Sequence, residues 1–287
     1  MRKDLRSGSY CAAIVVLYAG GLFAQRVPYR EVWYQNGNLH LEAYLYVPAG
    51  NGPFPVVIYN HGSRPPGYER RYTPMTAVAQ MLVADGYMVF EPTRRGYAKS
   101  DGLPLGEAVG TSHGDAYVQR LWEEAGDILA AEKFLDTIRS ADRQRVGMIG
   151  YSQGGTLSIF AASRAPGRFA CIVDQAGGTS WDRSSQLRQA LPAAAAKLHV
   201  PLLAMIAAND RTTASVRAVV DAAQKAHNTA RLIIYPPYTP PAEERPPGGG
   251  ALGHAIFRDH GIPIWQGDVR AFLASCLKHP GAPRKPK

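Results

Sequence analysis

The chain has 287 residues, of which 46% are hydrophobic and 19% are charged, values typical of a globular protein. A chain of this length can bury most of its apolar surface, so its stability needs neither disulfides nor a structural metal. The net charge of +9 includes +2 from the first 24 residues and +4 from the last ten, and the rest forms no basic stripe that would bind nucleic acid.

The first 24 residues are arranged like a secretory signal peptide. A cationic start precedes 13 uncharged residues, AAIVVLYAGGLFA, which are too few to span a bilayer comfortably. The pattern predicts cleavage after Ala24 and export to the periplasm or the medium, with an uncleaved N-terminal anchor as the alternative. Residues 25–278 are predicted to form one domain, followed by a basic flexible tail at 279–287.

Removal of the leader leaves two cysteines, Cys171 and Cys276. Their spacing matches no disulfide framework, and whether they pair stays open. Cys171 lies in an apolar strand-like segment, which predicts a small buried side chain.

The pattern of apolar residues predicts the secondary structure in chain order. Residues 31–48 predict two antiparallel strands joined by a turn at Asn36-Gly37. In the second strand, apolar and polar residues alternate from 39 to 47, which predicts burial on one face. Further strands are expected at 55–62, 87–92, 145–152, 169–177, 200–210 and 231–236, and helices at 73–86, 115–139, 153–163, 215–228 and 263–279.

Strands that are apolar on both faces and alternate with helices predict an α/β fold. We expect a mostly parallel central sheet of about eight strands, covered by helices on both faces and preceded by an antiparallel hairpin. Only a short segment separates the strands at 169–177 and 200–210, so no large cap domain is predicted. A Pro/Gly-rich loop at 236–250 precedes the last helix.

The segment GYSQG, residues 150–154, places Ser152 between two glycines. A predicted strand precedes it and a predicted helix follows it, and the glycines leave room for a sharp turn between them. Such a turn exposes the serine hydroxyl above the sheet at a helix N-terminus, as a nucleophile requires. A serine that merely caps the helix is the alternative, and the strand–turn–helix context favours the nucleophile.

A serine nucleophile needs a base, and the base needs a carboxylate. His254 lies in a loop between the last predicted strand and the last helix, at the sheet edge where ligands bind in such folds. His260, six residues later, is the nearest rival and is expected on the surface. Asp210 ends the preceding strand, although capping of the next helix would also explain it. Nucleophile, acid and base thus each follow a successive late strand.

Two backbone N–H groups are candidates to bind the oxyanion of the intermediate. One belongs to Gln153, the first residue after the nucleophile, and the other to Ser63 in the loop NHGS. Each such donor contributes roughly 3 kcal/mol to transition-state binding. His61 is expected to shape this loop by hydrogen bonding. Trp181 and the loop at 236–250 are weaker candidates to line the substrate pocket.

In these motifs the sequence resembles the α/β-hydrolase superfamily, most closely its dienelactone-hydrolase-like and prolyl-oligopeptidase-like esterases. The matching segments are NHGS, PTRRGYAKSDG, GYSQGG, AANDRTT and GHAIF, in the family's order, and the resemblance covers roughly residues 30–278. It implies that Arg95 and Ser100 hold a loop beside the site. Dienelactone hydrolases carry a cysteine nucleophile, and Ser152 departs from that pattern.

The leading interpretation is a serine hydrolase that cleaves small carboxylic esters through an acyl-enzyme. Ser152 attacks the carbonyl carbon, His254 takes the serine proton and Asp210 orients His254. No metal or organic cofactor is expected, and no His-Glu-x-x-His or Cys-x-x-Cys motif is present. A peptidase or amidase, an acyltransferase and a non-catalytic binding protein on the same fold are the alternatives. Prolyl oligopeptidases carry a large N-terminal domain, and the short segment before the first strands favours ester cleavage instead.

Overall fold

The computed structural model describes residues 28–245 and 250–278, and the predicted signal peptide and basic tail lie outside these ranges. The strands are β1 Tyr29–Asn36, β2 Leu39–Tyr46, β3 Phe54–Asn60, β4 Met88–Pro92, β5 Ala141–Tyr151, β6 Cys171–Gln175, β7 Leu202–Ala207 and β8 Ala230–Tyr235. Within the described residues they form one eight-stranded sheet in the order β1-β2-β4-β3-β5-β6-β7-β8. The pairs β1–β2 and β2–β4 are antiparallel, and all other neighbouring strands are parallel.

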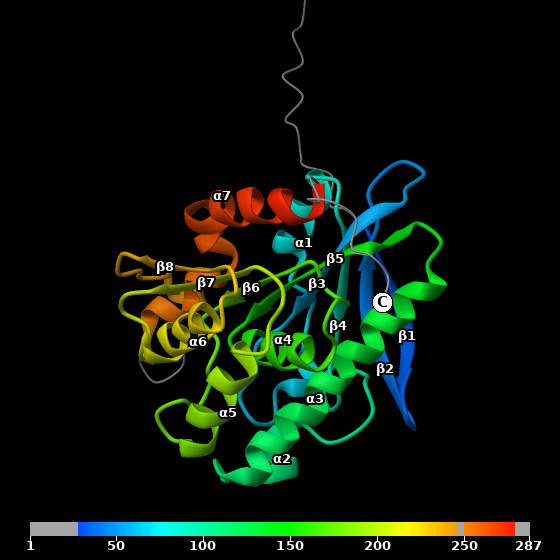
Figure 1. Cartoon of the computed structure of the whole chain (residues 1–287). Coiled ribbons are helices and arrows are strands. Elements are labelled where there is room, and N and C mark those ends of the chain that lie inside the picture. The colour runs from blue at the N-terminus through cyan, green and yellow to red at the C-terminus, as the bar shows by residue number, and fades with distance from the viewer. Residues whose placement is uncertain (1–27, 246–249, 279–287) are drawn as a thin grey trace, which may run out of the picture.

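Helices cover both faces of this sheet (Figure 1). They are α1 Thr76–Ala84, α2 Leu105–Val109, α3 Asp115–Phe134, α4 Gln153–Arg164, α5 Ser185–Ala195, α6 Ala214–Lys225 and α7 Ile262–Leu273. One core packs α1 and α7 against the sheet, and the other packs α3, α4 and α5 against its opposite face. This arrangement confirms the predicted α/β fold. No helix in the described ranges is both long enough and apolar enough to cross a bilayer.

The first hairpin differs from its prediction in two details. Its two-residue loop is Gly37-Asn38, one residue later than expected, because Asn36 pairs with Leu39. In addition, β2 is buried on both faces from Leu41 to Tyr46, whereas the alternation predicted burial on one face. The reason is that its apolar residues pack in the α3 core while Tyr44 and Tyr46 join the core on the α1 face.

Two helices, α2 and α5, have no counterpart among the predicted elements. In α5, Ser184 caps the first turn by accepting a hydrogen bond from the Leu187 N–H, at 3.0 Å. Pro192 lies inside the same helix and obscures the helical pattern in the sequence. Because α5 packs against α4 and α6, it belongs to the helical layer and forms no cap over the sheet edge.

Candidate active site

Ser152 lies between β5 and α4 in a strained backbone conformation. Its φ is +56° and its ψ is −118°, a combination that costs energy for a residue with a Cβ and is typical of functional sites. A Cβ at Gly150 would collide with the backbone of Gly154, and a Cβ at Gly154 would collide with the backbone of Asn60. The two glycines of the motif are therefore needed for the close approach of strand, turn and helix.

The structure brings His254 within hydrogen-bonding distance of both Ser152 and Asp210. His254 Nε2 lies 2.9 Å from Ser152 Oγ, and His254 Nδ1 lies 2.8 Å from Asp210 Oδ2. The carboxylate can only accept, so Nδ1 carries the imidazole proton and Nε2 accepts the proton of the serine hydroxyl. This is the arrangement that a nucleophile, a base and an orienting acid require.

Tyr151 contacts His254 through both its ring and its hydroxyl group. The two rings lie 5.1 Å apart, measured between centroids. The Tyr151 hydroxyl also donates a hydrogen bond to the His254 carbonyl, at 3.1 Å. Since Tyr151 precedes Ser152 directly, the same turn places Ser152 and contacts His254.

Hydrogen bonds join the Pro/Gly-rich loop to the segments that carry Asp210 and His254. The Asn209 amide accepts from the Tyr238 N–H at 2.8 Å and donates to the Tyr238 carbonyl at 2.9 Å. Arg258 donates to the Glu244 carbonyl at 2.9 Å. The described part of this loop therefore holds the segments that flank Asp210 and His254, through Asn209 and Arg258.

Ser63 and Gln153, the two candidate oxyanion donors, line one cavity of about 150 Å³. The loop that carries Ser63 lies against Ser152, since a Cβ on Gly62 would be 3.3 Å from Ser152 Cβ. Among the described residues, neither backbone N–H donates to a backbone carbonyl in the turns and loops. The N–H groups of Ser63 and Gln153 thus stay the candidate oxyanion donors.

A buried ion pair, Arg94 with Glu124, lies between the loop that carries Ser63 and the start of α4. The side chains of Arg94 and Glu124 are 1% and 0% exposed, and their charged groups are 3.2 Å apart. Arg94 also donates to the His61 carbonyl at 2.6 Å, and the side-chain amide of Gln153 donates to the Glu124 carboxylate at 2.7 Å. Burial raises the pKa of Glu124, and the guanidinium of Arg94 opposes that shift. Through Arg94, the Glu124 carboxylate thus links the loop that carries Ser63 to the first residue of α4.

Loss of this carboxylate should destabilise the fold. Glu124→Ala leaves Arg94 buried without its partner, and we expect the free energy of unfolding to fall by about 3–5 kcal/mol. Glu123→Ala is the matched control, because the Glu123 side chain is 43% exposed and its ion pairs with Arg95 and Arg120 are both long, at 3.5 Å. The control should change the unfolding free energy by at most about 1 kcal/mol. Urea unfolding compares the two variants, and equal losses would contradict the role assigned to Glu124.

The other residues expected to shape the loops do so in the structure. His61 Nδ1 donates to the Gly62 carbonyl at 2.7 Å, and burial lowers the pKa of His61, which keeps it neutral. Arg95 pairs with Asp127 at 2.7 Å. The Ser100 hydroxyl donates to the Thr93 carbonyl at 2.8 Å.

Trp181 takes a different place from the one predicted. Its side chain is 8% exposed and packs in the hydrophobic core, whereas Thr179 and Ser180 of the same loop line the cavity. Thr179 was not among the candidates, yet its Oγ1 lies 3.0 Å from Ser152 Oγ. Its local sequence, GGTS, has the composition of an ordinary turn, so nothing in the sequence marks it.

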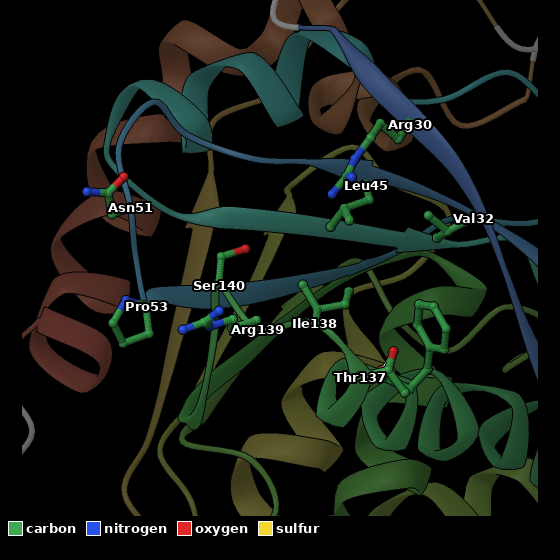
Figure 2. Close-up of a pocket in the computed structure, with 10 residues that line it drawn as sticks. Arg30, Val32, Leu45, Asn51, Pro53, Thr137, Ile138, Arg139 and Ser140 are labelled. Carbon is green, nitrogen blue, oxygen red and sulfur yellow. Dashed lines mark hydrogen bonds between the residues drawn. The ribbon is translucent and has the colours of Figure 1, made fainter.

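Away from Ser152, the described residues offer a larger cavity but no metal cluster. This cavity, of about 620 Å³, is lined by Asn51 and Pro53, which precede β3, and by Ser140, which precedes β5 (Figure 2). It therefore lies at the amino ends of the strands, opposite the edge that carries Ser152. No group of three or more His, Cys, Asp or Glu side chains in the described ranges is placed to hold a metal ion.

Known proteins share this architecture. Residues 36–238 match the X-Pro dipeptidyl-peptidase (S15) family. A Pyrococcus horikoshii acylaminoacyl peptidase aligns with 93% of this chain at TM-score 0.69 and 18% identity, but the chain spans only 45% of that protein. A Pyrococcus furiosus esterase aligns over 88% of this chain and 92% of its own length, at TM-score 0.60 and 17% identity. A Klebsiella pneumoniae protein assigned as a dienelactone hydrolase aligns over 88% and 98%, at TM-score 0.57 and 16% identity. These likenesses show the α/β-hydrolase fold.

Proposed function

The chain belongs to the X-Pro dipeptidyl-peptidase (S15) family, and we propose that it is a serine hydrolase that cleaves carboxylic esters through an acyl-enzyme. The observation that carries this proposal is the chain of contacts from Ser152 to His254 at 2.9 Å and from His254 to Asp210 at 2.8 Å. A hydroxyl is a weak nucleophile at neutral pH, and an adjacent base held by a carboxylate activates it.

In the proposed reaction, Ser152 Oγ attacks the acyl carbon while its proton passes to His254 Nε2. The carbonyl oxygen becomes an oxyanion, which accepts hydrogen bonds from the N–H groups of Ser63 and Gln153. His254 then gives the proton to the departing alcohol, which leaves the acyl group on Ser152. Water adds to the acyl carbon and loses a proton to His254, which returns it to Ser152 as the acid departs.

The cavity beside Ser152 supports a small acyl group as the substrate. Its volume of about 150 Å³ is below the range of roughly 300–1,000 Å³ that is typical of sites for drug-sized ligands. Much of its wall is apolar or aromatic, contributed by Pro66, Tyr97, Leu105, Val109 and Tyr117. Such a wall suits a short hydrocarbon chain.

Peptide cleavage is the second candidate, and the family match favours it. The same nucleophile, base and oxyanion donors would act on an amide, because acylation of the serine is common to both reactions. The distinction rests on the leaving group and on the size of the acyl part.

A panel of model substrates separates the two functions. p-Nitrophenyl esters from acetate to decanoate are assayed beside aminoacyl and X-Pro p-nitroanilides. We expect kcat/KM to be highest for acyl groups of about two to four carbons and at least roughly tenfold lower for octanoate. The reason is that a pocket of fixed size discriminates by about 1–3 kcal/mol for each surplus methylene. An X-Pro anilide that outperforms every ester would establish the peptidase instead.

A further inference from the structure

The loop that follows β6 is unusually strained. Within five residues, Ala176, Gly178 and Ser180 have φ values of +56°, +100° and +70°. Ala176 and Ser180 carry a Cβ, and such residues keep a positive φ only where the surrounding structure holds them. Backbone strain of this kind gathers at active sites, so Thr179, which lies between Gly178 and Ser180, needs a functional explanation.

Side chains from β6, α3, α4 and α6 hold this loop in place. From β6 and α4, the Asp174 and Thr156 side chains accept hydrogen bonds from the N–H groups of Gly177 and Gly178, each at 2.9 Å. From α3, the Tyr117 hydroxyl donates to the Thr179 carbonyl at 2.9 Å. From α6, the Ser215 hydroxyl donates to the Gly177 carbonyl at 2.7 Å. Because the anchors come from four elements, the position of Thr179 relative to Ser152 is set by the fold.

The result of this anchoring is that the Thr179 hydroxyl meets the nucleophile. Thr179 Oγ1 lies 3.0 Å from Ser152 Oγ. Ser152 has one hydroxyl proton, and His254 Nε2, at 2.9 Å, accepts it. Thr179 must therefore be the donor in its contact with Ser152.

We propose that Thr179 is a further catalytic residue, whose hydroxyl donates a hydrogen bond to Ser152 Oγ and stabilises the negative charge that gathers there. This inference rests on the proposed function of Ser152. Charge develops on Oγ as its proton leaves for His254 during acylation. It develops again when Oγ is the leaving group of deacylation, before His254 returns the proton. Thr179 neither gains nor loses a proton in either step.

The test compares Thr179→Val, which keeps the shape and removes the hydroxyl, with Thr179→Ser, which keeps the hydroxyl. The measured quantities are kcat and KM for a p-nitrophenyl ester and the rate constant for labelling of Ser152 by a fluorophosphonate. A neutral hydrogen bond lost in the transition state corresponds to a rate about tenfold lower. We expect Thr179→Val to lower kcat and the labelling rate constant by about tenfold at unchanged KM, and Thr179→Ser to stay within about twofold of the wild type.

Two outcomes would overturn the inference. Equal slowing in both variants would show that packing of the side chain matters and the hydroxyl does not. Wild-type rates in Thr179→Val would show that the contact with Ser152 is not used. Ser152→Ala, measured in parallel, separates these outcomes from failure of the proposed function: if it keeps its esterase activity, the nucleophile itself is misassigned.

Discussion

Ser152→Ala is expected to lower kcat for ester hydrolysis by roughly 10⁶-fold while leaving the fold intact. The substitution removes the atom that attacks the acyl carbon, and no acyl-enzyme can form without it. Alanine retains the Cβ, so the strained turn at φ +56° is no worse for the variant than for the wild type. Steady-state assays and urea unfolding measure the two effects separately.

The control for this variant is Ser163→Ala, at the far end of the same helix. The Ser163 hydroxyl donates only to the Phe160 carbonyl, at 2.9 Å, and it should be dispensable for the reaction. A fluorophosphonate should label wild-type protein at Ser152 and leave the Ser152→Ala variant unlabelled. Labelling of another serine, or esterase activity that survives in Ser152→Ala, would contradict the assignment of the nucleophile.

The architecture and the proximity of Ser152, Asp210 and His254 could be predicted because both follow from local pattern and chain order. Apolar segments alternating with helices predict parallel strands, and parallel strands bring their carboxyl ends to one edge. Ser152, Asp210 and His254 each follow such a strand, so their proximity needed no knowledge of side-chain packing. The two-residue glycine spacing around Ser152 adds a second, independent signal.

The parts that could not be predicted depend on contacts between distant segments. Arg94 and Glu124 are 30 residues apart, and nothing local shows that they pair in the interior. Burial of β2 on both faces depends on packing by residues far along the chain, so its polar alternation was misleading. Thr179 and Trp181 lie two residues apart, and only the path of the loop decides that the threonine, and not the tryptophan, lines the cavity.

His254→Ala should lower kcat about as far as Ser152→Ala, because the members of a triad act as a unit. Without the imidazole, no group accepts the proton of Ser152 Oγ. Asp210→Asn should cost less, about 10⁴-fold, since the imidazole remains but the carboxylate that holds its Nδ1 proton, at 2.8 Å, is lost. Measurement of kcat for the three variants on one ester gives this order.

His260→Ala is the matched control, and it tests the choice between two histidines six residues apart. The His260 side chain is 56% exposed, and its Nδ1 lies 3.0 Å from Glu244 Oε1. That carboxylate raises the pKa of His260, which favours the protonated imidazole and makes it a poor acceptor of a serine proton. The His260→Ala variant should therefore keep its kcat within about twofold, because it removes only the contacts of an exposed imidazole with Glu243 and Glu244. An inactive His260→Ala beside an active His254→Ala would transfer the base to His260, and full activity in both would favour a non-catalytic role for the site.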